Sequence, residues 1–168
     1  MTPDSSHFID SSLREKVIEH LFVGDLLRCL WRQGVHNVEV LRAEVDRGGY
    51  DLVFECGHII RHVQLKSSYS GAQTREVDVS LNLAGKPSGC VIWLWCNPEN
   101  MQLGPFLWFG GAPEEPLPAL GDKIGTNSRG RKTARPNIRV VKKSKFQKLG
   151  TIEEIATKLF SGFITFVG

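Results

Sequence analysis

The chain has 168 residues, with 41% apolar and 23% charged composition and a formal net charge of +3. It is long enough for one domain, residues 1–168, with a core of its own, which excludes a small scaffold that depends on disulfide bonds. The polar N-terminus and the lack of any run near the roughly 18 apolar residues of a membrane span argue against a secretory signal or a membrane helix.

The N-terminal third is expected to begin with a helix and continue with strands. Ser11 or Ser12 can cap a helix that runs to about Gln33, and apolar residues around most of its circumference predict a core helix. Alternation of apolar and polar residues then predicts three strands, at 37–45, 50–55 and 58–66.

The middle of the chain is expected to return to helix and then to strand. Residues 75–84 have a weaker amphipathic pattern that predicts a second helix, and the dense apolar run 90–96 predicts a buried strand. A further strand is expected at 105–111, followed by a proline-rich connection. The expected order over residues 11–96 is therefore helix, three strands, helix and strand, and residues 97–168 follow as a C-terminal extension.

The extension carries much of the positive charge. Residues 122–148 contain ten lysines or arginines and one acidic residue, which leaves eleven basic and seventeen acidic residues elsewhere. A basic segment beside an acidic body is typical of proteins that hold a polyanion near an acidic metal site, although a solvated loop has the same composition. A strand is expected at 137–141, and the capping box of Thr151 and Glu154 predicts a final helix that ends near residues 161–162.

No role in the site is assigned to the cysteines or to three of the tryptophans. The four cysteines form no C-x-x-C pair and have no histidines at zinc-finger spacing, which predicts reduced thiols in a cytoplasmic protein. The tryptophans Trp93, Trp95 and Trp108 are assigned to core packing rather than to base stacking.

Glu19 places a carboxylate in an apolar helix stripe, because Val23, Leu26 and Leu30 follow it at helical spacing. A buried carboxylate requires a cation, a hydrogen-bond donor or a shifted pKa. A bound metal would satisfy it, and so would a backbone amide or an arginine at the edge of the helix.

A second cluster of polar side chains is expected across a hairpin. Asp51 opens its strand, where aspartate is unfavourable, and a two-residue turn at 56–57 would place it opposite His62. Because side chains alternate along a strand, His62, Gln64 and Lys66 share the face of Asp51. This face predicts a functional site, and a solvent-facing polar side of the sheet is the alternative.

Glu19, the segment Gly-Tyr-Asp-Leu-Val at 49–53 and the segment His-Val-Gln-Leu-Lys-Ser-Ser at 62–68 resemble the PD-(D/E)XK, or restriction endonuclease-like, nuclease superfamily. The resemblance covers residues 11–96. It implies an α/β fold of helix, three-strand meander, helix and strand, with a central mixed sheet flanked by helices. Tyr50 replaces the proline of the motif, and Gln64 replaces its second acid, which makes this a Q-x-K variant with weaker expected magnesium binding.

By this resemblance, Mg²⁺ is expected to bind Glu19, Asp51, the Gln64 side-chain oxygen and the Leu65 backbone carbonyl, with Mn²⁺ as a substitute. Lys66 is expected to orient and help deprotonate the attacking water. The implied catalytic set is Asp51, Gln64, Lys66 and Glu19, and the bond broken is a phosphodiester.

Other residues are assigned auxiliary roles. His62 is a candidate for proton transfer or phosphate contact, Ser68 for phosphate contact, and Glu15 for a weaker role beside Glu19. An exposed sheet histidine and a turn serine are the alternatives. The basic segment is expected to hold the nucleic-acid backbone. Its candidate residues are Arg129, Arg131, Lys132, Arg135, Lys142 and Lys143.

The function expected from these residues is that of a metal-dependent phosphodiesterase, a DNA endonuclease that acts alone or as a homodimer and has no membrane partner. The alternative is a catalytically inactive protein of the same fold that binds nucleic acid or a partner protein, with Gln64 as the mark of lost activity. A structural domain whose polar sheet face is a protein interface is a third interpretation.

Overall fold

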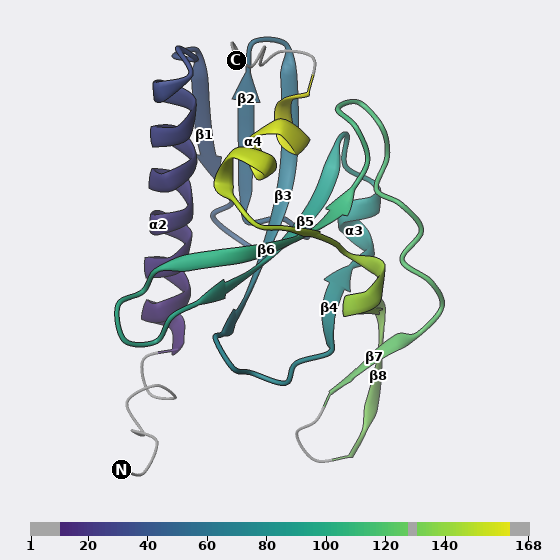
Figure 1. Cartoon of the computed structure of the whole chain (residues 1–168). Coiled ribbons are helices and arrows are strands. Elements are labelled where there is room, and N and C mark those ends of the chain that lie inside the picture. The colour runs from purple at the N-terminus through teal and green to yellow at the C-terminus, as the bar shows by residue number, and fades with distance from the viewer. Residues whose placement is uncertain (1–10, 128–130, 162–168) are drawn as a thin grey trace.

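A six-stranded mixed sheet lies at the centre of the computed structural model, which describes residues 11–127 and 131–161 (Figure 1). Its strand order is β1-β2-β3-β5-β6-β9, and only β3 and β5 pair in parallel. The strands are β1 (Val38–Arg42), β2 (Leu52–Cys56), β3 (Ile59–Tyr69), β5 (Gly89–Cys96), β6 (Leu103–Gly110) and β9 (Gln147–Leu149). The strands expected at 37–45, 50–55, 58–66, 90–96 and 105–111 are thus confirmed.

Two helices cover one face of this sheet, α2 (Ser11–Arg32) and α4 (Ile152–Phe160). Phe22 of α2 is fully buried and meets the edge of Phe54 in β2, with ring centroids 6.3 Å apart. The capping box of Thr151 and Glu154 is present at the start of α4, as the sequence predicts. The core helix and the final helix are therefore where apolar spacing and capping residues place them.

A second, three-stranded sheet covers part of the opposite face, in the order β4-β8-β7. Buried Val79 of β4 and Val141 of β8 pack with Trp93 and Trp95 of β5, so the tryptophans lie in the core as expected. The elements of this layer are β4 (Glu76–Ser80), α3 (Leu81–Ala84), β7 (Ile124–Asn127), β8 (Thr133–Lys142) and the 3₁₀ turn η1 (Lys143–Lys145). The basic segment is thus folded against the core, and its expected strand 137–141 is part of β8.

The helix predicted at 75–84 is wrong. Residues 76–80 form the strand β4, and only Leu81–Ala84 is helical, with the Ser80 side chain accepting a hydrogen bond from the Asn82 amide. β4 is held by its pairing with β8, where Val77 lies opposite Val141. That partner lies far along the chain, so a local helical pattern misses it, and tertiary pairing decides the conformation.

The predicted register of the β2–β3 hairpin is also wrong. Val53, not Asp51, lies opposite His62. The turn falls at Gly57 and His58, one residue later than predicted, and Gly57 has a φ of 60°, which glycine adopts readily. The resulting shift of two residues leaves the same side chains on the same face, because side chains alternate along a strand.

The loop that joins β1 to β2 is attached to α3. Gly49 has a φ of 74°, and a Cβ atom there would lie 2.8 Å from the Ser80 Cβ and 2.9 Å from the Leu83 nitrogen. The Asn82 side-chain amide donates a hydrogen bond of 2.8 Å to the Arg47 carbonyl. The backbone that leads into Asp51 is therefore in close contact with the second layer.

Two expectations from composition can be compared with these elements. Cys29, Cys56, Cys90 and Cys96 are all buried and free, in agreement with the expected reduced thiols. Across 11–127 and 131–161, no helix is both long and apolar enough to cross a membrane.

Candidate functional site

A pocket of about 350 Å³ lies between the N-terminal half of α2, the β1–β2 loop and β3. It brings together all the residues expected to bind metal or to catalyse. Its lining comprises four acidic residues (Glu15, Glu19, Asp46 and Asp51), three basic residues (Arg14, Lys16 and Lys66), and Ile18, Gln64, Leu65 and Ser67.

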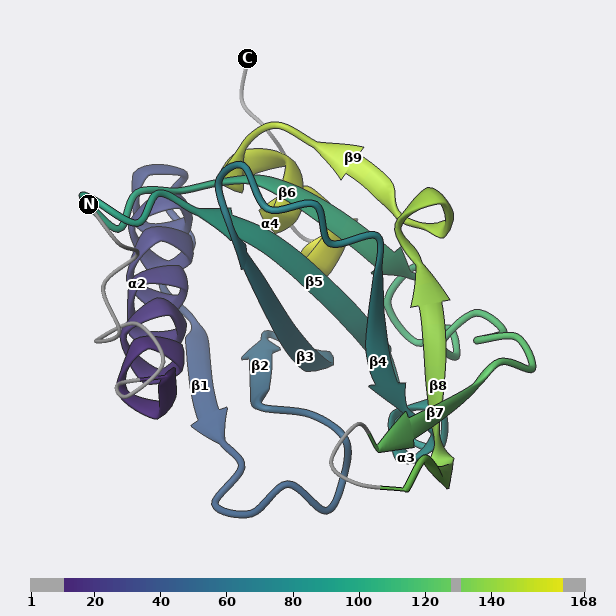
Figure 2. The same cartoon turned by 90° about the horizontal axis from the view of Figure 1, so that it is seen from below.

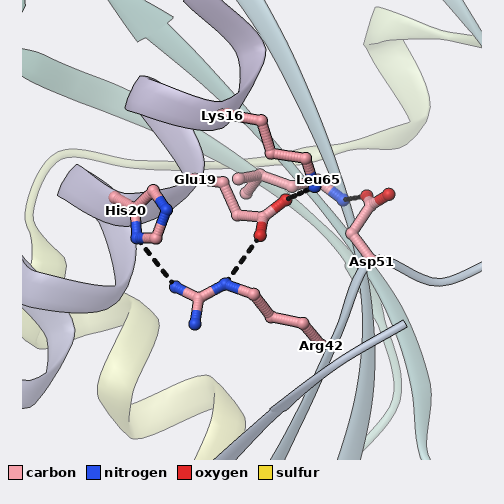
Figure 3. Close-up of polar contacts among 6 residues, drawn as sticks. All are labelled: Lys16, Glu19, His20, Arg42, Asp51 and Leu65. Atoms are coloured by element: carbon pink, nitrogen blue, oxygen red, sulfur yellow. Dashed lines mark hydrogen bonds and ion pairs between the residues drawn. The ribbon is translucent and has the colours of Figure 1, made fainter. Parts of the chain in front are cut away.

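Asp51 is fixed at the start of β2 by two hydrogen bonds to β3. Its backbone amide donates to the Val63 carbonyl at 2.8 Å. Its Oδ2 accepts from the Leu65 amide at 2.7 Å (Figure 3). Burial raises the pKa of the Asp51 carboxyl above its usual range, and the charges of Asp46 and Glu19 add to the rise, while the Leu65 amide and Lys66 oppose it. The surroundings of the ionised carboxylate therefore hold too little positive charge to stabilise it fully, and a bound cation would supply that charge.

Gln64 provides an acceptor without a partner. The side chain is only 7% exposed, and its Oε1 atom has no hydrogen bond within the part of the chain that the structure describes. A buried polar atom without a partner is uncommon, and an amide oxygen is a good ligand for a hard cation. This observation fits the expected metal site.

The donor set contains fewer charges than a fully acidic site. Among residues 11–127 and 131–161, no group of three or more histidine, cysteine, aspartate or glutamate side chains is arranged to hold a metal ion. Glu19 and Asp51 line the pocket together with the Gln64 amide and with Leu65. A cation held there would depend on the amide oxygen and on a backbone carbonyl to complete its oxygen ligands.

Glu19 has two basic partners that the sequence analysis did not name. Its Oε1 accepts a hydrogen bond of 2.9 Å from the Arg42 Nε, and its Oε2 lies 3.3 Å from the Lys16 Nζ (Figure 3). The Arg42 Nη2 also lies 3.1 Å from the His20 Nδ1. The arginine alternative for this buried carboxylate is therefore present, although Glu19 also lines the pocket.

The position of Arg42 follows from strand pairing. Arg42 is the last residue of β1 and lies opposite Leu52, the neighbour of Asp51. From the sequence, only a correctly predicted β1–β2 register would have placed Arg42 near the site. Lys16 could be recognised as a partner, because it lies three residues before Glu19 on the same helix.

The auxiliary candidates lie in different places. Glu15 lines the pocket, but the Ser68 hydroxyl accepts a hydrogen bond of 3.0 Å from the Trp93 indole and is not in the lining. The His62 Nδ1 lies 2.7 Å from the Pro87 carbonyl oxygen, and the histidine ring meets the edge of Tyr50. His62 is therefore also outside this pocket.

The described residues expected to bind nucleic acid lie in the β7–β8 connection, on β8 and in η1, and none of them lines the pocket. α2 and the β7–β8 hairpin lie on opposite sides of β3 (Figures 1 and 2). Arg131, Lys132 and Lys142 are exposed, whereas Arg135 pairs with Asp78 at 3.3 Å. The Lys143 ammonium lies 4.6 Å from the centroid of the Trp95 ring. Arg129 lies outside the described residues.

Comparison with known proteins gives similarities of fold only. No protein-family model matches the chain, and no curated protein matches it. A Holliday junction resolvase from the archaeal hyperthermophile Archaeoglobus fulgidus is similar over 82% of this chain and 98% of its own, with 18% identity and a TM-score of 0.42. A bacterial homing endonuclease is similar over 73% of this chain and 80% of its own, with 23% identity and a TM-score of 0.35.

Proposed function

We propose that the chain is a divalent-metal-dependent phosphodiesterase that cleaves DNA, with the 350 Å³ pocket as its active site. The observation that carries the proposal is the buried, unpartnered Gln64 Oε1 in a pocket that also holds the Asp51 carboxylate and the Lys66 amine. Two carboxylates and an amide attract a hard cation, and an ammonium group beside them suits a phosphate or an attacking water.

The cation would be Mg²⁺, or Mn²⁺ in its place, held by Asp51, Glu19, the Gln64 Oε1 and the Leu65 carbonyl. Bound there, it would neutralise charge on the phosphate oxygens and lower the pKa of a bound water. Asp51 is suited to the central position because its Oδ2 is oriented by the Leu65 amide, and burial leaves its carboxylate in need of a cation.

We assign to Lys66 the direct contact with the attacking water and the phosphate. This residue lies two residues after Gln64 on β3, so both side chains leave the same face of the strand and both line the pocket. Its ammonium group would orient the attacking water and stabilise negative charge that develops on the phosphate. Glu19 would contribute once its contacts with Arg42 and Lys16 give way to the cation.

A polyanionic substrate is supported by the charges of the β4-β8-β7 sheet. Arg131 and Lys132 in the β7–β8 connection and Lys142 at the end of β8 are exposed, and none of the three forms an ion pair with another described residue. Exposed lysine and arginine bind the phosphate backbone in a salt-dependent and sequence-independent way. These side chains would add affinity for DNA without taking part in the chemistry.

The test is cleavage of plasmid DNA and of mixed DNA and RNA oligonucleotides in Mg²⁺ or Mn²⁺. We expect the wild-type protein to cleave DNA and Lys66→Ala to lose about 10²- to 10⁴-fold in rate. Lys148→Ala is the matched control, because Lys148 is exposed on β9 and does not line the pocket. Equal cleavage by wild type and Lys66→Ala, or cleavage that persists in EDTA, would contradict this active site.

A second function is favoured by the contacts of Glu19. Both of its carboxylate oxygens have basic partners, and Gln64 adds no charge, so the pocket can be stable without a metal. The corresponding protein would bind nucleic acid or a partner protein without cleaving it. Salt-sensitive DNA binding with no cleavage in either metal would support this second function against the first.

A further inference from the structure

The active-site pocket continues into a second pocket of about 220 Å³ along the end of β3. The two pockets share Arg14, Ile18 and Ser67, so they are adjacent parts of one surface. From Ser67 the second pocket extends past Tyr69 to Thr74, in the connection between β3 and β4. This surface therefore leads away from the proposed metal ligands and toward the start of β4.

The two pockets differ in charge. Among the described residues, the first is lined by four carboxylates. The second has none among them and is lined by one arginine, three serine or threonine residues, one tyrosine and two apolar residues. An acidic pocket suits a cation, and a pocket with a guanidinium and several hydroxyl groups suits an anion. The shared wall is formed in part by Arg14.

Arg14 is held in a defined orientation. Its guanidinium lies over the Tyr69 ring, 4.7 Å from the centroid, and its Nη1 donates a hydrogen bond of 3.0 Å to the Tyr69 hydroxyl. A guanidinium has five N–H donors in a fixed plane and matches the oxygen geometry of phosphate. A stacked and hydrogen-bonded arginine loses little side-chain entropy when it binds a second group.

We propose that this second pocket binds the phosphate that neighbours the cleaved bond on the same strand, with Arg14 as the phosphate-binding residue and the hydroxyls of Ser67 and Thr74 beside it. This inference rests on the proposed function, since it takes the substrate to be a nucleic-acid strand. The bound nucleic-acid strand would then run from the metal ligands along the end of β3 toward Thr74.

The test is binding of a short DNA duplex and of a single strand by fluorescence anisotropy, in EDTA, over a range of salt concentrations. We expect Arg14→Gln to bind about 5- to 10-fold more weakly near ~0.1 M salt and to reduce the salt slope by about one phosphate contact. Its affinity for Mn²⁺, measured by calorimetry without DNA, is expected to match that of the wild type within about twofold, because a phosphate contact adds nothing to metal ligation.

Arg28→Gln is the matched control. Arg28 lies on the same helix, pairs with Asp25 at 3.3 Å and lines neither pocket, so its loss is expected to leave the salt slope nearly unchanged. If Arg14→Gln fails to fold, Arg14→Lys and Thr74→Val replace it. Arg14→Lys keeps the charge and is expected to lose affinity with little change in slope, and Thr74→Val leaves the Arg14–Tyr69 contact intact.

The outcomes separate the two proposals. DNA cleavage by the wild type together with unchanged binding by Arg14→Gln, or by both replacement variants, would overturn the assignment of the second pocket alone. A wild-type protein that neither binds nor cleaves nucleic acid would overturn both proposals. A loss of Mn²⁺ affinity equal to the loss of DNA affinity would show that Arg14 acts through the first pocket, and it would also overturn the assignment.

Discussion

The pocket beside α2 and the β4-β8-β7 sheet both carry charge, but they carry it differently. In the pocket, Glu19 and Gln64 are each only 7% exposed, and the Asp51 carboxyl has a raised pKa because of burial. In the β7–β8 connection of the sheet, Arg131 and Lys132 are exposed. Buried charges must be matched by specific partners, whereas exposed charges interact weakly and in a salt-dependent way. The first region therefore suits chemistry at one phosphate, and the second suits general attraction of a polyanion.

The largest expected effect on DNA binding belongs to the connection between β7 and β8. Reversing the charges of Arg131 and Lys132 to glutamate is expected to weaken DNA binding about 10- to 100-fold near ~0.1 M salt, because two phosphate contacts become repulsive. Cleavage at saturating DNA is expected to change little. Anisotropy titrations and single-turnover kinetics measure the two quantities.

A variant at Arg135 on β8 tests whether an existing ion pair lowers the contribution of an exposed basic side chain to DNA binding. Arg135 pairs with Asp78 at 3.3 Å, so Arg135→Gln is expected to have a smaller effect on binding than a change at Arg131. If the charge reversal lowered the single-turnover rate instead of the affinity, the separation of the two regions would be wrong.

A smaller effect is expected at Asp51. Because its pKa is raised in the folded protein, the folded state holds this proton to a higher pH than the unfolded chain does. The metal-free protein should then lose stability as the pH rises from the unfolded-state pKa through the folded-state pKa. Asp51→Asn removes this loss. Its free energy of unfolding at neutral pH is expected to exceed that of the wild type by about 1 kcal/mol, or about 2–4 °C in Tm.

Thermal melts in EDTA over a pH series measure this gain, and repetition with Mn²⁺ provides the control. The wild type should be stabilised by Mn²⁺ and the Asp51→Asn variant should not. A variant that is less stable than the wild type at neutral pH would mean that the Asp51 charge is well satisfied without a metal.

The smallest effect is expected at Arg42. Its guanidinium occupies Glu19 Oε1 at 2.9 Å, so a metal must compete with it for the carboxylate. Arg42→Ala is therefore expected to tighten Mn²⁺ binding about two- to fivefold by calorimetry, the range of a partly exposed ion pair. Lys16→Ala should do less, because the Lys16 contact is longer and its side chain is 62% exposed.

A double-mutant cycle with Glu19→Gln shows whether the effect passes through this carboxylate. Arg42→Ala should change metal affinity much less in the Glu19→Gln background. Weaker metal binding by Arg42→Ala alone would mean that Arg42 holds Glu19 in its binding position rather than competing for it.

The sequence was sufficient where a local pattern determines the structure. The apolar surface of α2, the alternation in β2 and β3, and the capping box of α4 depend on residues a few positions apart. The site prediction tolerated a register error because a shift of two residues keeps Gln64 and Lys66 on one face. The predicted ligands could therefore line one pocket despite the error.

The sequence was insufficient where distant segments meet. β4 is a strand because β8 pairs with it, and Arg42 reaches Glu19 because β1 ends beside β2 and α2 crosses near it. The partner of Ser68, the Trp93 indole, likewise comes from a neighbouring strand. Propensity and spacing contain little information about such contacts, since tertiary packing decides them.

Gly49 lets the β1–β2 loop, which leads into the proposed active site, pack closely against α3. With less than 3 Å between a Cβ at this position and atoms of Ser80 and Leu83, even alanine would push the loop off α3. The displacement would pass two residues along the backbone to Asp51, whose carboxylate is aligned by a single amide. A methyl group outside the pocket would thus misalign the proposed metal ligand, and under the proposed function mutational tolerance around α3 would reflect catalysis as well as packing.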